Sequence, residues 1–191
     1  FLLRKAAPVN HVTSEGATPL YIAAQNGHPE VAALLLNNGA TANLATTTGV
    51  TPLFIAAQNG YRDIVALLLR HKADANQAAE DGVTPLFIAA QRGQHTVVEL
   101  LLQHGTSANL ASADGSTPLF VAAQNGHLPT VSLLLEQGAT VNRAMRDGAT
   151  PLLVAAQNGH RAIVELLLEH GARINQTVQN DLLALGKPEE R

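Results

Sequence analysis

Histidine offers the broadest chemistry of any residue type in this sequence, because its ring can bind a metal or transfer a proton near neutral pH. Three of the eight histidines, His71, His104 and His170, occupy one position of a pattern with a period of 33 residues. Packed helices lie roughly 8–10 Å apart, whereas zinc holds its ligands at about 2 Å. We therefore predict no metal site, and interpret these side chains as partners of free carbonyl groups at a helix end.

Three further histidines follow a glycine between two expected helices, and we interpret them as capping or turn residues: His28, His127 and His160. The fifteen acidic residues are scattered and form no recurrent close pair of the kind that acid–base catalysis needs. The sequence also lacks the G-x-S-x-G, H-E-x-x-H, Walker and G-x-G-x-x-G motifs. It contains no cysteine, which excludes disulfides, thiolate zinc sites and cysteine nucleophiles. We predict that the chain is not an enzyme and takes no cofactor, metal or small-molecule substrate.

Charge and hydropathy exclude two further classes of partner. Twelve basic residues stand against fifteen acidic ones, and the basic residues do not cluster with aromatic residues as nucleic-acid binding requires. The longest apolar runs, such as 64–69, are far shorter than the roughly 20 residues that span a bilayer. The start at Phe1 lacks the features of a signal peptide, so we expect a fragment of a longer chain. With no cysteine, a cytoplasmic location fits best.

The elements that position these residues are set by an internal repeat. The tripeptide Thr-Pro-Leu recurs every 33 residues, starting at Thr18, Thr51, Thr84, Thr117 and Thr150. Each copy opens a near-identical stretch, such as TPLFIAAQNG at residues 51–60. An asparagine keeps the same period, at Asn10, Asn43, Asn76, Asn109, Asn142 and Asn175. A fixed period of this length predicts a stack of identical supersecondary units.

One unit shows how the sequence builds its helices. The Thr51 hydroxyl can cap a helix start, and Pro52 presets the backbone of its first turn. Gly60 ends this short helix, because glycine tolerates the left-handed conformation that follows a last turn. An apolar stripe then predicts a second helix over 62–70, and a polar turn follows at 76–82. Helices this short are marginal alone, so stacking must stabilise them.

The period, the Thr-Pro-Leu start, the Ala-Ala pair, the Leu-Leu-Leu stretch and the closing asparagine resemble the ankyrin repeat. This resemblance implies an all-α solenoid of stacked helix-turn-helix units with projecting β-turn or hairpin loops. The implied units are the tail of a preceding repeat at 1–13, five repeats at 14–46, 47–79, 80–112, 113–145 and 146–178, and a C-terminal cap or tail at 179–191. Its implied function is non-catalytic binding of another protein, through the loop tips and the exposed part of the first helices.

Two positions depart from the family pattern. The residue after Thr-Pro-Leu is usually His in ankyrin repeats, but here it is Tyr21, Phe54, Phe87, Phe120 or Leu153. We expect the rings to form a column that packs between neighbouring units. Lys72 occupies a slot that is glycine in the other repeats, so we expect a strained left-handed backbone and a locally weaker second unit.

The resemblance places the binding surface at named positions. The tips carry Glu15, Thr47, Thr48, Glu80, Asp81, Asp114, Arg146 and Asp147. The first helices end in a ladder of amides, from which Gln91, Gln124 and Asn125 are the candidate contacts. Arg92 interrupts this ladder and is the sharpest candidate, because Arg is enriched at interfaces. The tips also vary as solvated turns do, and the ladder also fits structural hydrogen bonding or recent duplication.

The resemblance also implies a modification. Ankyrin repeats are substrates of an asparaginyl hydroxylase that favours a leucine eight residues before its target. That spacing holds for Asn43, Asn76, Asn109, Asn142 and Asn175. These asparagines have structural roles in the turn as well, so modification remains a hypothesis.

Two other functions fit the same residues. The array can be a passive spacer in which the amide ladder carries no information. It can equally be the targeting module of a larger enzyme or effector whose catalytic domain lies elsewhere.

Overall fold

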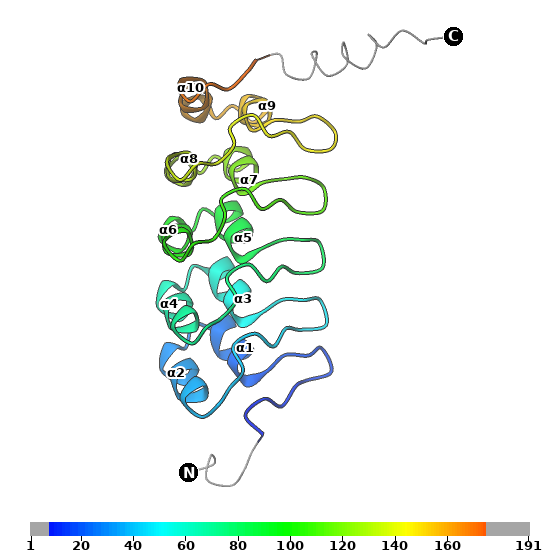
Figure 1. Cartoon of the computed structure of the whole chain (residues 1–191), viewed down its shortest axis with the longest axis vertical. Coiled ribbons are helices and arrows are strands. Elements are labelled where there is room, and N and C mark those ends of the chain that lie inside the picture. The colour runs from blue at the N-terminus through cyan, green and yellow to red at the C-terminus, as the bar shows by residue number, and fades with distance from the viewer. Residues whose placement is uncertain (1–7, 175–191) are drawn as a thin grey trace, which may run out of the picture.

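The computed structural model describes residues 8–174, which form five helix pairs stacked into an elongated array (Figure 1). The first helices of the pairs are α1 (Pro19–Gln25), α3 (Pro52–Asn59), α5 (Pro85–Gln91), α7 (Pro118–Gln124) and α9 (Pro151–Gln157). The second helices are α2 (Pro29–Asn37), α4 (Arg62–Arg70), α6 (His95–Gln103), α8 (Leu128–Glu136) and α10 (Arg161–Glu169). Each set forms one layer, and the loops project beyond the layer of first helices (Figure 1). The predicted all-α solenoid is confirmed.

The predicted capping of the first helices is also confirmed. The Thr51 side-chain oxygen accepts a hydrogen bond from the Phe54 N–H at 3.1 Å, and the threonines that precede the other four first helices do the same. Pro52 stands in the first turn, where its missing N–H costs nothing. Gly60 closes α3 with a φ of 77°, in the left-handed region that favours glycine. The second helix of this repeat spans Arg62–Arg70, as the apolar stripe predicts.

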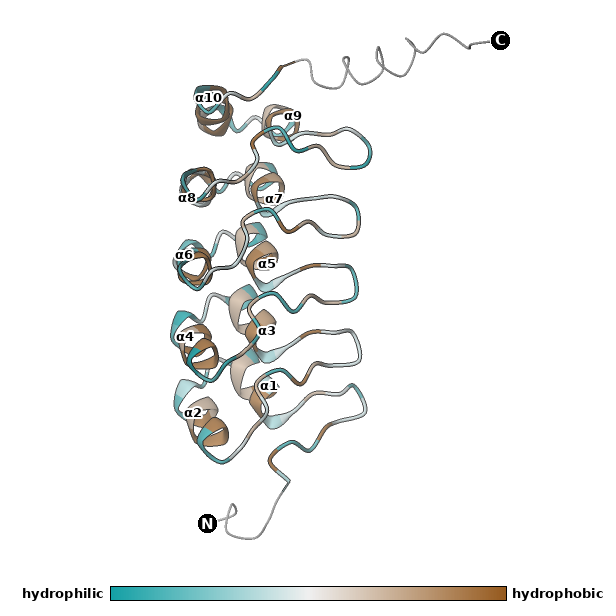
Figure 2. Cartoon of the chain, in the orientation of Figure 1, coloured by the Kyte–Doolittle hydropathy of each residue, from teal (hydrophilic) through white to brown (hydrophobic). Residues whose placement is uncertain are grey.

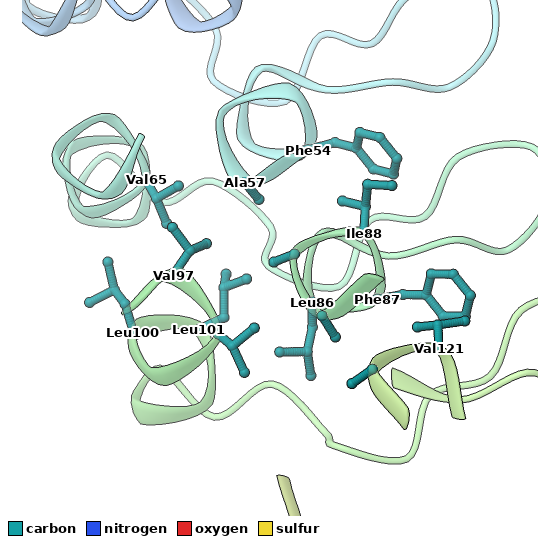
Figure 3. Packing of buried hydrophobic residues seen from close by; sticks show 14 of the residues in the cluster. Phe54, Ala57, Val65, Leu86, Phe87, Ile88, Val97, Leu100, Leu101 and Val121 are labelled. Carbon is teal, nitrogen blue, oxygen red and sulfur yellow. The ribbon is translucent and has the colours of Figure 1, made fainter. Parts of the chain in front are cut away.

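A continuous apolar core joins the two helical layers. Its members recur at equivalent positions of each repeat, such as Val65 and Val98. Across the boundary between α4 and α6, Val65 faces Val97 (Figure 3). Hydrophobic residues concentrate on the helices, and the projecting loops are more polar (Figure 2). Burying such side chains contributes roughly 1.5–3 kcal/mol each. No unit buries its stripe alone, which is why the array must be stacked.

The aromatic column takes a different form from the one expected. The Phe54 ring lies beside Ile88, and the Phe87 ring lies beside Val121 (Figure 3). Each ring thus meets a branched aliphatic residue of the next repeat. This pairing of a ring with an aliphatic side chain follows from the sequence, because the residue after the ring position is Ile or Val in every repeat.

Backbone hydrogen bonds tie the loops into a ladder. In the loop that begins the fourth repeat, the Ser112 N–H donates to the Ser116 carbonyl at 3.0 Å and closes a tight hairpin. Between repeats, the Ala113 N–H donates to the Asp81 carbonyl at 2.8 Å. The same bond recurs along the array, from Thr47 to Glu15, from Glu80 to Thr48 and from Arg146 to Asp114. Successive loop tips are therefore held side by side by main-chain groups.

Lys72 adopts the predicted left-handed backbone, with a φ of 61°. It is the one non-glycine residue with positive φ among residues 8–174. The terminal segments that sequence assigned to a preceding repeat and to a C-terminal cap lie partly or wholly outside the described residues, as does Asn175.

Candidate interaction groove

A groove of about 540 Å³ runs across the third to fifth repeats, between the loops and the first helices. Its residues come from α5, α7 and α9 and from the loops that precede α7 and α9. The lining comprises Phe87, Gln91, Asp114, Ser116, Phe120, Val121, Gln124, Met145, Asp147, Ala149, Leu153, Val154 and Gln157. The groove therefore combines an apolar floor with amide and carboxylate walls.

The amide wall follows from the repeat period. Gln91, Gln124 and Gln157 are the last residues of α5, α7 and α9, so stacking places equivalent amides in a row. Gln124 and Gln157 are exposed, which leaves their side chains available to a partner. An amide can both donate and accept hydrogen bonds, so this wall suits the main chain of an extended polypeptide.

The carboxylate wall is held rigidly by the hairpins. One oxygen of Asp114, Oδ1, accepts from the Ser112 hydroxyl at 2.6 Å and from the Ser116 N–H at 2.9 Å. These bonds lower the pKa of the Asp114 carboxyl, so it stays ionised at neutral pH. Asp147 is held by the main-chain bond alone, because its Oδ1 accepts from the Ala149 N–H at 3.0 Å and Met145 stands where Ser112 does.

Leu153 sits at the position that carries an aromatic ring in the other four repeats. Its side chain is 38% exposed, whereas the equivalent Phe120 is 4% exposed. Both residues line the groove. Leu153 is more exposed because α9 is the last of the first helices within residues 8–174, so no further described repeat packs against it.

Four of the partner-binding residues predicted from sequence come together in this groove: Gln91, Asp114, Gln124 and Asp147. The others are not part of its lining. Thr47, Glu80 and Arg146 donate main-chain N–H groups to the inter-repeat ladder, and Glu15, Thr48 and Asp81 accept with their carbonyls. Glu15 also lies near Tyr21, whose pKa is raised first by burial and then by the Glu15 charge.

Arg92 lies in a different hollow, of about 430 Å³, with Gln58, Asn59, Tyr61 and Gln94. Its side chain makes no hydrogen bond or ion pair with another residue of the described range. Arg92 is also the residue that follows α5, and its main-chain N–H donates to the Ile88 carbonyl at 3.1 Å. The two sharpest groups of candidates from sequence, Arg92 and the acidic tips, therefore belong to separate surfaces.

Asn125 has a structural role. Its side-chain nitrogen donates to the Val121 carbonyl of its own helix at 2.7 Å, and Asn26 and Asn158 bond in the same way.

The periodic asparagines of the turns form hydrogen bonds as well. Asn109 accepts from the Thr140 N–H at 2.8 Å and donates to the Gly138 carbonyl at 3.0 Å, which links two repeats. Asn43 accepts similarly from the Asp74 N–H. Hydroxylation of these asparagines stays a prediction.

The histidines that follow a glycine do more than the sequence suggests. His127 and His160 stand at the residue before a helix, but neither side chain caps it. The His127 Nε2–H instead donates to the Gln91 carbonyl at 3.0 Å, and His160 bonds to the Gln124 carbonyl at 3.0 Å. The capping alternative is therefore wrong for these two side chains, because their partners lie in the preceding repeat, whereas both residues do lie in the turn between two helices. His104 and His170 bond to carbonyls of their own helices at 2.9 Å, as expected.

The rings of His127 and His160 each pack against a glycine of the preceding repeat. A Cβ on Gly126 would stand 2.7 Å from Cε1 of His160, and one on Gly93 would stand 2.6 Å from Nδ1 of His127. Both glycines also have positive φ. Repeat spacing along the groove thus depends on glycines that leave room for the next repeat.

Sequence reasoning did not identify Phe120, Met145, Val154 or Gln157 as groove residues. Their periodic positions were visible, but the side of the helix that remains open depends on how the layers pack.

Within residues 8–174, no group of three or more His, Asp and Glu side chains is arranged to hold a metal ion. No helix in that range is long and apolar enough to cross a membrane.

The stacked helix pairs, the projecting hairpins and the open groove define a helical repeat scaffold of the solenoid class. Three overlapping copies of a family model described as ankyrin repeats match residues 1–79, 39–112 and 86–178. The chain belongs to the ankyrin-repeat family, as its sequence motifs predict. Ankyrin repeats are generally protein–protein interaction modules and typically lack catalysis. A search of curated proteins found no match to the chain.

Proposed function

We propose that this chain is a non-catalytic scaffold that binds another protein through the groove of the third to fifth repeats. The observation that carries the proposal is the groove itself, because it presents a row of amides and fixed carboxylates around an apolar floor at which Leu153 is exposed. Such a combination suits a short extended segment of a partner, whose side chains enter the floor while its main chain bonds to the amides.

The groove is built on a rigid frame. Its loops are tied by main-chain hydrogen bonds, and its helices are joined through the buried core. A partner therefore binds a surface that is already formed, which reduces the entropy lost on association. A passive spacer has no need of an open groove with fixed charges, which favours a binding function over that alternative.

Blocking the groove with a neutral ring tests the proposal. Gln124→Trp places a bulky side chain on the exposed end of α7, inside the groove. Gln103→Trp places the same side chain on the exposed end of α6, in the outer layer. A displayed library of random peptides is selected on the wild-type chain, and the enriched peptides are measured against both variants.

We expect peptides that bind the wild-type chain and Gln103→Trp alike, and Gln124→Trp at least tenfold more weakly. Circular dichroism and urea unfolding establish that both variants remain folded. Enriched peptides that bind Gln124→Trp as tightly as the wild-type chain would contradict the proposed site. A library that yields no binder at all would favour a spacer.

A further inference from the structure

Within residues 8–174, neither carboxylate of the groove forms a salt bridge, although Arg146 adjoins Asp147 and its N–H donates to the Asp114 carbonyl at 3.2 Å. Asp114 and Asp147 line the groove, and no Lys, Arg or His is among the described residues of that lining. Asp114 uses only Oδ1 in its hairpin bonds, and the same is true of Asp147. The Oδ2 atom of each is thus left with unused acceptor capacity beside the apolar floor.

Charge complementarity then identifies the chemistry of the occupant. An acidic segment would bring like charges to Asp114 and Asp147, whereas a basic segment would replace their water with charge-assisted hydrogen bonds. The floor between them adds an apolar contact from the exposed Leu153, which suits an aliphatic side chain. The occupant that satisfies both features carries basic and aliphatic residues together.

The repeat spacing constrains the pattern of that segment. Asp114 and Asp147 are equivalent positions in successive repeats, and packed helices lie roughly 8–10 Å apart. An extended polyproline II segment has three residues per turn and rises about 3.1 Å per residue, so every third side chain faces the same way at roughly 9 Å. Basic residues at every third position therefore match successive carboxylates.

We propose that the groove of the third to fifth repeats selects an extended segment with Arg or Lys at every third position and aliphatic residues between them. This inference rests on the proposed function, since it names the partner chemistry for the same groove. Asp114 and Asp147 receive the basic residues, the floor receives the aliphatic ones, and the amide row bonds to the main chain.

Three peptides of one design test the inference. The basic peptide is acetyl-Gly-Arg-Leu-Pro-Arg-Leu-Pro-Arg-Gly-amide with a fluorescent label, and its twins carry Gln or Glu in place of every Arg. The acceptor variant is Asp114→Asn with Asp147→Asn, which keeps the shape of both side chains. Its matched control is Glu99→Gln with Glu136→Gln, which removes the same charge from exposed positions on α6 and α8 of the outer layer.

Fluorescence anisotropy should show the basic peptide binding most tightly and the acidic twin most weakly. The Asp114→Asn, Asp147→Asn variant should lose about three- to thirtyfold in affinity for the basic peptide, the range expected for two exposed charge pairs. The outer-layer control should lose much less. Affinity for the Gln twin should not change in either variant.

Three results would overturn the inference, and they are distinguishable. If Gln124→Trp abolishes binding of all three peptides but the two Asn substitutions change nothing, the groove binds peptides without regard to charge, and the proposed function stands. If the basic peptide binds Gln124→Trp and the wild-type chain equally, it binds elsewhere, and both proposals fail for this ligand. Equal losses in the outer-layer control would indicate an effect of net charge alone and also overturn the inference.

Discussion

The loops of the second and fourth repeats have the same backbone but different chemistry. Each is a hairpin closed by one bond of 3.0 Å, from Thr46 to Val50 and from Ser112 to Ser116. Each has a left-handed glycine at its tip and is bonded to its neighbours on both sides. The side chains at the tips differ: Thr48 shares a neutral hydroxyl pair with Thr46 at 3.1 Å, whereas Asp114 presents a fixed carboxylate.

This difference separates two tasks within one repeat. Main-chain bonds and glycines build the frame, and they recur along the array, except that Lys72 replaces one glycine of the second repeat. The side chain at one tip position then sets the local charge, and neither frame bond depends on it. A repeat array can therefore vary its ligand chemistry along its length with little loss of stability.

The largest effect is expected where the frame itself is changed. Gly126→Ala should destabilise the chain, because the residue has a φ of 79° and its new Cβ would stand 2.7 Å from Cε1 of His160. Left-handed geometry costs about 1–2 kcal/mol and overpacking adds about 1–3 kcal/mol. Urea unfolding measures the loss.

Gly138→Ala is the matched control for this substitution. Gly138 has a φ of 80°, but nothing lies within 4 Å of the site of its Cβ. It should lose only the roughly 1–2 kcal/mol of the backbone. Equal losses in the two variants would show that the ring beside Gly126 does not constrain the stack.

An exchange between the two loops is expected to change binding more than stability. Asp114→Thr should weaken binding of the basic peptide about three- to fivefold, whereas Thr48→Asp should leave it nearly unchanged. Both variants should unfold within about 0.5 kcal/mol of the wild-type chain, since the frame bonds are main-chain. Anisotropy and urea unfolding measure the two quantities. Tighter peptide binding in Thr48→Asp than in the wild-type chain would move the site to the second repeat.

Lys72→Gly should stabilise the chain by roughly 1 kcal/mol, because glycine adopts a φ of 61° without the strain that a Cβ brings. This substitution tests the expected weakness of the second repeat, which carries the neutral loop. A higher urea midpoint with an unchanged slope is the expected result. No gain, or a loss, would mean that Lys72 carries little strain.

The smallest effect concerns acid stability. Hydrogen bonds from Ser112 and Ser116 lower the pKa of Asp114 in the folded chain. The resulting stabilisation is present above the unfolded pKa of about 3.9 and is lost as the pH falls through the folded pKa. When the pH is lowered from 6 to an acidic value, the free energy of unfolding should therefore fall less in Asp114→Asn than in the wild-type chain. Urea midpoints at the two pH values measure this, and parallel losses would contradict it.

Local features were predictable from the sequence. Thr51, Pro52 and Gly60 specify where a helix begins and ends, because capping and backbone preference act within a few residues. The left-handed Lys72 follows from its alignment with glycines at the same position. The family follows from the period of 33 residues together with the Thr-Pro-Leu motif that recurs in each unit.

The inter-repeat features were not predictable in the same way. The bond from His127 to Gln91 joins residues whose separation in sequence is about one repeat, and its formation depends on the exact stacking geometry. The groove also depends on that geometry, which brings Asp114 and Asp147 to one lining and leaves Arg92 outside it. Residue type identified Asp114, Asp147 and Arg92 as candidate contacts. Only the packing of the repeats shows which of them line the same groove.

Photo-crosslinking at single introduced cysteines tests the groove assignment most directly, because the chain has no cysteine of its own. Ala113→Cys and Thr47→Cys are equivalent exposed tip positions in the fourth and second repeats. Each variant is labelled with a benzophenone and irradiated with the basic peptide. The account predicts several-fold more crosslinked peptide at position 113 than at position 47, and equal yields or a higher yield at position 47 would contradict it.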